Sequence, residues 1–326
     1  MKRLLGHRGS RVAVRLGISL ALLGTLLWHV DPARVIAPLQ KLSPAFVLLA
    51  CLYYAGCQLL SSWRWRMFLD AKGIGVPLAS LFSYYMSGMF LNNFLPGAVG
   101  GDAARSYFLY RHCGQGHYAL GSVFLERFAG LLGLGLISIG ALAAYPPGTG
   151  QPLILGAVGG SAVLLMGIAL ALWWPPLANG IQRLLGRFLP WGTGNRLREF
   201  HDTLASYRQH PGTLVRAVLL SVAIQGLYAL FYGLVALGLD ISIDLRYFLL
   251  FLPPVTLLML LPLSFGGLGI REAAFVVLFA QVGVGAPDVM AVSLTVHGLG
   301  ILLSLAGGVL LVRSRKSTPG VSWRGT

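Results

Sequence analysis

The sequence predicts an all-α protein, a polytopic helical membrane bundle of about eight to nine hydrophobic segments, each spanning helix needing roughly 20 apolar residues. Of the 326 residues, 56% are hydrophobic and only 11% are charged, whereas an ordinary soluble domain has about 25% charged residues. The 43 glycines also fit membrane helices, in which glycine is commoner than in soluble helices. Residues 1–326 are therefore interpreted as a single integral membrane domain.

Near-continuous apolar runs predict the individual spans in chain order. The runs lie near residues 12–30, 44–60, 79–95, 118–144, 152–174, 214–237 and 289–312. The first run follows a basic N-terminus and lacks a small-residue cleavage site, so it is interpreted as a retained span and not as a signal peptide. Two further regions are interrupted: residues 96–116 contain prolines, glycines and charges, and residues 247–284 are broken at Pro262.

The distribution of Lys and Arg predicts the side of the membrane that each loop faces. With a cytoplasmic N-terminus, nineteen of these residues fall inside and three outside, the inside ones mostly near the N-terminus, in loops 61–77 and 175–213, and in the tail 313–326. This bias follows the positive-inside rule, and it accounts for the formal net charge of +15 without nucleic acid as a partner. We expect a multi-pass protein of the bacterial inner membrane with cytoplasmic N- and C-termini, and an interfacial helix within loop 175–213.

The orientation of the spans constrains the two interrupted regions. The spans at 79–95 and 118–144 both run outward, so residues 96–116 must carry the chain back inward. The same argument requires a turn within residues 247–284. Each interrupted region is therefore expected to contain short, broken or re-entrant membrane helices.

Both interrupted regions contain the pattern P-x-x-x-G-G-x-x-x-R. The two copies run from Pro96 to Arg105 and from Pro262 to Arg271. The span before the first copy runs outward and the span before the second runs inward, so the repeats at about residues 79–144 and 247–312 are predicted to be inverted. Interrupted hydrophobic segments at corresponding positions of inverted halves indicate a transporter's binding site near the membrane midplane.

The residue types of this pattern suit an anion. Each proline ends the incoming helix, and each glycine pair, Gly100-Gly101 or Gly266-Gly267, permits positive φ or the close approach of another group. The next helix then offers free N–H groups and a partial positive charge beside an arginine, a combination that suits a phosphate. An arginine at the centre of a membrane helix costs roughly 2.5 to 3.5 kcal/mol on insertion scales, so it needs a partner or a ligand. Each copy is interpreted as half of an anion clamp, with structural pairing to Asp102, Glu126 or Glu272 as the alternative.

Other polar residues near the two copies complete the predicted site. Glu126 is a candidate counter-ion, proton carrier or buried partner, and its neighbour Arg127 points about 100° away around the helix. Asp102 is predicted to cap its helix, and Asn93 to bond the broken backbone or to join two helices. The predicted binding residues are Arg105, Arg271, Gly100, Gly101, Asp102, Gly266, Gly267, Glu126, Arg127, Glu272 and Asn93. No metal or cofactor is expected, because the three cysteines lack ligand spacing and no nucleotide-binding motif occurs.

The segments Asn92 to Arg105 and Pro262 to Glu272 resemble the two signatures of the flippase-like family, which is the transmembrane region of lysylphosphatidylglycerol synthase and its stand-alone relatives. The resemblance covers about residues 12–312, and Glu126-Arg127 matches a position where the family commonly has an E-R pair. Full-length synthases continue into a soluble aminoacyl-transferase domain, so synthase activity is not expected here. The resemblance implies a membrane module that binds or translocates a lipid with an anionic or phosphate-bearing headgroup.

Three functions fit these observations. The favoured one is a flippase-like transporter without enzymatic activity, which binds a phospholipid, polyprenyl-phosphate or glycolipid headgroup in a midplane cavity. The second is a membrane enzyme that transfers a group onto a lipid phosphate, with Glu126, Asp102 or Glu272 as the base. The third is a non-transporting membrane partner of a lipid-modifying pathway, which docks a separately encoded soluble transferase through its basic loop.

Overall fold

The fold is given by a computed structural model, which describes residues 32–93, 99–144, 152–173, 203–260 and 267–316 together with scattered residues between 17 and 30. All the regular elements within these ranges are helical, so the prediction of an all-α protein is confirmed. Several predicted features lie largely or wholly outside these ranges: the first span, the interfacial helix of loop 175–213, most of the tail 313–326, Pro96, Pro262 and Gly266.

The helices fall into a long and a short class. The long helices are α3 (Pro44–Asp70), α6 (Gly116–Ala143), α7 (Pro152–Trp173), α10 (Pro211–Gly238) and α13 (Ala286–Lys316). The short elements are α2 (Pro32–Ile36), η1 (Ala37–Lys41), α4 (Leu78–Asn92), α5 (Val99–Cys113), η2 (Tyr207–Gln209), α11 (Leu245–Leu260) and α12 (Ile270–Ala280). By length and composition, α3, α6, α10 and residues Ala286–Val312 of α13 are able to cross a membrane.

Helix α3 is longer than the sequence predicts. It begins after Ser43, whose hydroxyl accepts a hydrogen bond from the Phe46 N–H, and it continues to Asp70, beyond the predicted end at residue 60. Arg64, which the sequence places in the loop 61–77, is instead a helical residue of α3, and its side chain, like that of Trp65, is buried within the bundle. A hydropathy window ends a span at an arginine, since it does not register a carboxylate supplied by another helix.

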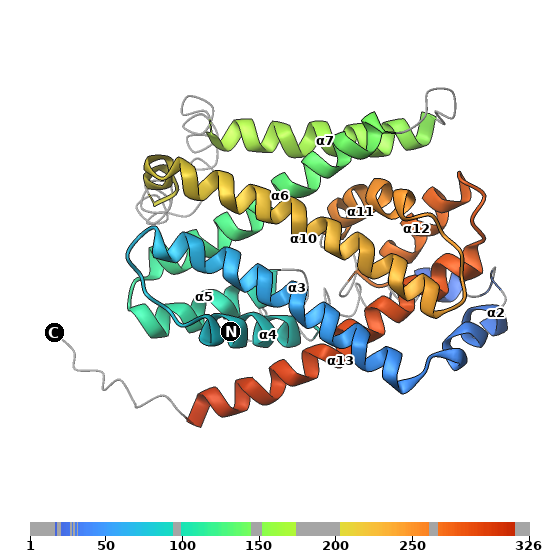
Figure 1. The fold of residues 1–326 in the computed structure, drawn as a ribbon, viewed down its shortest axis with the longest axis horizontal. Helices are drawn as coiled ribbons and strands as arrows, with labels where there is room; N and C mark the ends of the chain where they lie inside the picture. Colours follow the sequence, from blue (N-terminus) through green and yellow to red (C-terminus); the bar gives the residue numbers. More distant parts are fainter. Residues whose placement is uncertain are drawn as a thin grey trace, which may run out of the picture.

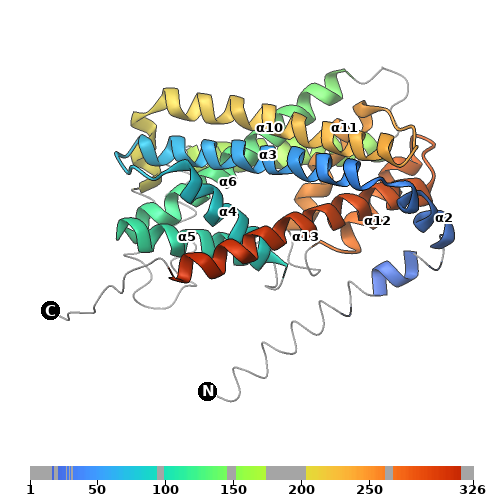
Figure 2. The same ribbon diagram turned by 60° about the horizontal axis from the view of Figure 1, so that its bottom comes forward.

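The short helices α4, α5, α11 and α12 occupy two different parts of the molecule. Helices α4 and α5 have 15 residues each, and α11 and α12 have 16 and 11, fewer than the roughly 20 that a full crossing needs. Figure 1 shows α4 and α5 together in one half of the bundle and α11 and α12 in the opposite half, an arrangement that the turned view of Figure 2 retains. Helices α3, α10 and α13 run along both halves.

Glycines bring α4 into close contact with α5 and α13. A Cβ at Gly101 would collide with the Gly88 carbonyl oxygen and the Asn92 side chain, so α5 lies directly against α4. A Cβ at Gly307 of α13 would likewise collide with the backbone of Met86. In a bilayer the lipid tails are as apolar as the core, so close packing of this kind is what holds helices together.

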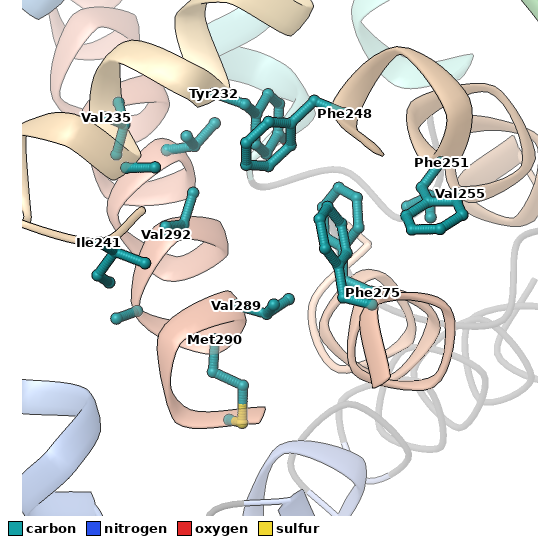
Figure 3. Close-up of a cluster of buried hydrophobic side chains, with 14 of the residues drawn as sticks. Tyr232, Val235, Ile241, Phe248, Phe251, Val255, Phe275, Val289, Met290 and Val292 are labelled. Atoms are coloured by element: carbon teal, nitrogen blue, oxygen red, sulfur yellow. The ribbon is translucent and has the colours of Figure 1, made fainter. Parts of the chain in front are cut away.

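Aromatic side chains pack α11 and α12 against α10. Figure 3 shows Tyr232 of α10 beside Phe248 of α11, with Phe275 of α12 nearby. The ring centroids of Tyr232 lie 5.7 Å from Phe248 and 5.6 Å from Phe275, and those of Phe251 and Phe279 are 4.9 Å apart. These aromatic pairs bury large surfaces with favourable edge geometry. The half of the bundle that contains α11 and α12 therefore has an aromatic, largely apolar core.

Candidate anion-binding site

Five ionisable side chains from three helices meet in the half of the bundle that contains α4 and α5. They are Arg64 of α3, Asp102 and Arg105 of α5, and Glu126 and Arg127 of α6, and we call them the charge cluster. Glu126 is 0% exposed, Arg105 2% and Arg64 5%. Charges this deep in a membrane protein are costly unless they are paired, so the pairing within the cluster decides what it can bind.

Glu126 pairs two arginines that come from different helices. Its Oε1 accepts a hydrogen bond from Nη2 of Arg64, and its Oε2 accepts one from Nη2 of Arg105 at 3.1 Å. Arg64 also donates from Nη1 to the Ser221 hydroxyl of α10 at 2.8 Å. Of the three roles considered for Glu126, this geometry is that of a counter-ion.

Asp102 pairs the remaining arginine and shares Arg105. Its Oδ1 accepts from Arg105 Nη2 at 2.8 Å, and its carboxylate receives Nε and Nη2 of Arg127 at 2.9 and 3.0 Å. The predicted helix cap is wrong, because α5 already begins at Val99 and Asp102 lies inside its first turn. The N–H of Gly101 is instead accepted by Asn92 Oδ1 at 2.6 Å. The Asp102 carboxylate therefore pairs with arginines, and the Asn92 side chain accepts from the backbone of α5.

The charge cluster retains positive charge and hydrogen-bond donors that its own members do not satisfy. Three guanidinium groups face two carboxylates, which leaves one positive charge in excess. Arg105 Nη1 and Arg64 Nε are buried and have no hydrogen-bond partner within the described part of the chain. Leaving a buried polar group unpaired costs roughly 1 to 3 kcal/mol, and more when it is charged. An anion would cancel the excess positive charge, and oxygen lone pairs are the acceptors that these donors lack.

The surroundings of Arg105 and Arg127 suit such a ligand. The Arg105 guanidinium carbon lies 4.3 Å from the ring centroid of Tyr85 and 5.2 Å from that of Trp65, so the aromatic faces hold its plane. The side chain of Arg127 is 43% exposed, although it lies on the apolar helix α6. The charge cluster therefore has an accessible end at Arg127 and a buried end at Glu126.

A second polar cluster lies in the half of the bundle that contains α11 and α12, and its positive and negative charges cancel within the cluster. Arg271 of α12 donates from Nη2 to Glu272 Oε1 at 2.6 Å, from Nε to Ser293 Oγ at 3.0 Å, and from Nη1 to His297 Nδ1 at 3.3 Å. Glu272 Oε2 accepts from the N–H of Gly269 at 2.8 Å. All three nitrogens of the guanidinium are engaged and the two charges cancel, in contrast with Arg105.

The glycine pairs serve different purposes in the two copies of the repeated pattern. Gly267 has φ +81° and the nearby Gly269 has φ +82°, a conformation that glycine adopts without strain. Gly100 and Gly101 are helical residues of α5, and Gly101 is required for the close approach to α4. A close approach occurs in both copies, because a Cβ at Gly267 would collide with the Met259 side chain, whereas among the described residues of the two copies the positive φ is found in the second.

The remaining predicted residue, Asn93, joins two helices: its Nδ2 donates to Ser304 Oγ of α13 at 2.7 Å. Four of the predicted residues, Asp102, Arg105, Glu126 and Arg127, do lie together, whereas Arg271 and Glu272 form the separate cluster. Sequence reasoning missed Arg64. The apolar run Met67-Phe68-Leu69 after it signals that the helix continues.

A family model and several similar proteins agree on the kind of protein that this chain resembles. The sequence pattern of the family described as the lysylphosphatidylglycerol synthase TM region matches residues 12–308. A UPF0104 membrane protein of Pyrococcus horikoshii is 26% identical over 92% of this chain and 96% of its own length. Two UPF0104 membrane proteins of Methanothermobacter thermautotrophicus are 25% and 27% identical, covering 90% and 79% of this chain and 91% and 80% of their own lengths. The chain is similar to multi-pass membrane proteins along nearly its whole length.

Proposed function

This chain belongs to the family of the lysylphosphatidylglycerol synthase transmembrane region, and we propose that it acts as a flippase-like lipid transporter. In this proposal the charge cluster binds an anionic or phosphate-bearing lipid headgroup near the membrane midplane, and the protein moves that lipid between leaflets. No catalytic step is assigned to the chain. Membership of the family supports a lipid-related role, and the transport step is our own inference.

The unsatisfied Nη1 of buried Arg105 carries this proposal. A donor of a charged group that is buried without an acceptor is unfavourable, and the cluster around it has one positive charge in excess. A phosphate oxygen would accept from Arg105 Nη1, while Arg127, which is partly exposed, would meet the headgroup first. The phosphate group and guanidinium are a strongly complementary pair.

We propose further that the two pairs of short helices are the inverted halves of a transporter. Helices α4 and α5 would be one re-entrant pair, and α11 and α12 the other, within a bundle of about eight to nine hydrophobic segments. The closed cluster around Arg271 supports a structural role for that arginine, which would hold α12 against α13. The excess of Lys and Arg in the predicted inside loops supports cytoplasmic termini, and a bacterial inner membrane is part of this proposal.

Native mass spectrometry of the purified protein tests the binding step. We expect the parent protein to retain a phosphate-bearing lipid and an Arg127→Ala variant to retain at least about tenfold less, the equivalent of about 1.4 kcal/mol. Arg246→Ala is the matched control, because Arg246 is an exposed arginine whose salt bridge within the described ranges is with nearby Asp244. The retained lipid is then made fluorescent and its movement between leaflets is measured in proteoliposomes.

The alternatives give different results in the same experiments. If the parent and both variants retain identical lipids, the arginines of the cluster are structural and the proposal of a headgroup site is wrong. If the lipid is retained specifically but does not change leaflet, the transport step is wrong, and a membrane partner of a lipid-modifying transferase becomes the better description.

A further inference from the structure

We infer that the headgroup bound at the charge cluster carries a single negative charge, as a phosphodiester does, and that Asp102 sets this preference. The inference rests on the proposed function, since it specifies the ligand of the same site. It follows from the count of charges and from the one carboxylate of the cluster that is within reach of a ligand.

The number of charges in the cluster is well defined. Arginine is not deprotonated in proteins, so Arg64, Arg105 and Arg127 contribute three positive charges. Glu126 accepts from Arg64 and Arg105, and Asp102 accepts from Arg105 and Arg127, so each carboxylate enters the count with one negative charge. The cluster therefore presents one net positive charge to whatever enters it.

A buried site favours the ligand that brings its total charge to zero, because residual charge is poorly screened away from water. A phosphodiester with one negative charge achieves this. A phosphomonoester with two negative charges would leave one negative charge in excess, and a zwitterionic headgroup would leave the positive charge of the site uncompensated. The predicted order of binding is therefore phosphodiester first, with the monoester and the zwitterion behind it.

Asp102 is the member of the cluster through which this order can be changed. Its side chain is 22% exposed, whereas Glu126 is fully buried between two guanidinium groups. Asn at position 102 has the same shape and keeps an oxygen acceptor for Arg105 and Arg127, but it raises the net charge of the cluster from one to two. Conversely, Arg127→Gln lowers the net charge to zero and retains a polar side chain at the accessible end.

The test is competitive lipid retention. The parent protein, Asp102→Asn and Arg127→Gln are placed in nanodiscs containing equal amounts of phosphatidylglycerol, phosphatidic acid and phosphatidylethanolamine. These lipids supply a phosphodiester with one net negative charge, a phosphomonoester, and a phosphodiester whose charge is cancelled by an ammonium group. The pH is held near 8.5, above the second phosphate pKa of about 6 for a monoester, and bound lipids are identified by native mass spectrometry. Asp244→Asn, which removes an exposed carboxylate in a distant loop, is the control for a general change of protein charge.

We expect the parent and Asp244→Asn to retain phosphatidylglycerol about tenfold over phosphatidic acid, Asp102→Asn to reverse that order, and Arg127→Gln to lose its preference for anionic lipids. Thermal unfolding of each variant establishes that it is folded. If Asp102→Asn keeps the order of the parent, the charge-matching inference is wrong while binding of anionic lipids stands. If the parent retains no anionic lipid, the proposed function itself fails.

Discussion

The carboxylate of Glu126 lies between the guanidinium groups of Arg64 and Arg105, and through them it connects α6 to α3 and α5. Its two arginine partners have exposed fractions of 5% and 2%, so solvent does not replace the ion pair if it is lost. Removing one partner of a buried pair leaves an uncompensated charge, which costs far more than the pair itself contributes. At the residue scale, the stability of this half of the bundle depends on Glu126.

Glu126→Gln is therefore expected to lower the free energy of unfolding by about 3 to 5 kcal/mol. Asp70→Asn is the matched control, because the Arg66–Asp70 pair also joins an arginine of α3 to a carboxylate but both side chains are about half exposed. Exposed pairs contribute about 0 to 1 kcal/mol. Thermal unfolding in detergent measures both variants, and equal shifts in the two would show that Glu126 is not a buried counter-ion.

Sequence reasoning found four of the five ionisable residues of this site and named Asp102 and Glu126 as candidate partners of Arg105, but it did not find the pair of Glu126 with Arg64. Asp102, Arg105, Glu126 and Arg127 stood out because each is an ionisable group within an apolar run. Arg64 did not stand out, because an arginine near the end of a span is usually an interfacial residue. Its partner Glu126 is 62 positions away along the chain, so no local pattern connects the two.

At the scale of the elements, the contact between α4 and α13 depends on small residues. Gly307 of α13 lies against the backbone of Met86, and the Ser87 hydroxyl donates to the Gly307 carbonyl oxygen at 3.3 Å. Nearby, Asn93, which follows the last residue of α4, donates to Ser304 of α13. Small residues with interhelical polar contacts are the usual means by which membrane helices associate. A side chain at position 307 would separate the two helices.

Gly307→Ala is expected to destabilise the protein by about 1 to 3 kcal/mol, the usual cost of forcing extra atoms into a packed core. Gly298→Ala is the control in the same helix, because a Cβ there meets nothing within 4 Å. In Gly298→Ala the helix propensity of alanine should leave stability unchanged or slightly higher. The thermal unfolding midpoints of the two variants decide the matter, and a Gly307→Ala protein as stable as Gly298→Ala would contradict the packing described here.

At the scale of the whole molecule, the loops divide between two ends of the bundle. Figure 1 places the connection from α3 to α4 and the connection from α10 to α11 at opposite ends, as does Figure 2. Lys72 of the first connection donates to the carbonyl oxygen of Ser206, so Lys72 and the neighbouring Arg208 lie at the same end. From the positive-inside rule we propose that this end faces the cytoplasm.

Cysteine labelling tests this orientation. Cys51, Cys57 and Cys113, which form no disulfide, are first replaced, and single cysteines are then introduced as Gly75→Cys in the α3–α4 connection or Ser242→Cys in the α10–α11 connection. Both positions are exposed. A membrane-impermeant thiol reagent should label Ser242→Cys in intact cells and Gly75→Cys only after lysis. The reverse pattern would invert the proposed topology.

The sequence by itself determined that this protein lies in a lipid bilayer, where most of its helices are, and to which family it belongs. Apolar runs predicted α4, α6, α7, α10 and α13 to within a few residues, because burial in lipid requires continuous local hydrophobicity. The two copies of the repeated pattern likewise depend only on the order of residues along the chain.

Only the tertiary structure decided where α3 ends and which arginine has a spare hydrogen-bond donor. Arg105 and Arg271 occupy the same position in the two copies, and yet Arg271 is fully paired by its neighbour Glu272, by Ser293 and by His297, whereas Arg105 shares its carboxylates with Arg64 and Arg127. The physical reason is that the charge balance of a buried site is summed over side chains that separate helices bring together. That sum is a property of the packing, and it is absent from any single segment of the sequence.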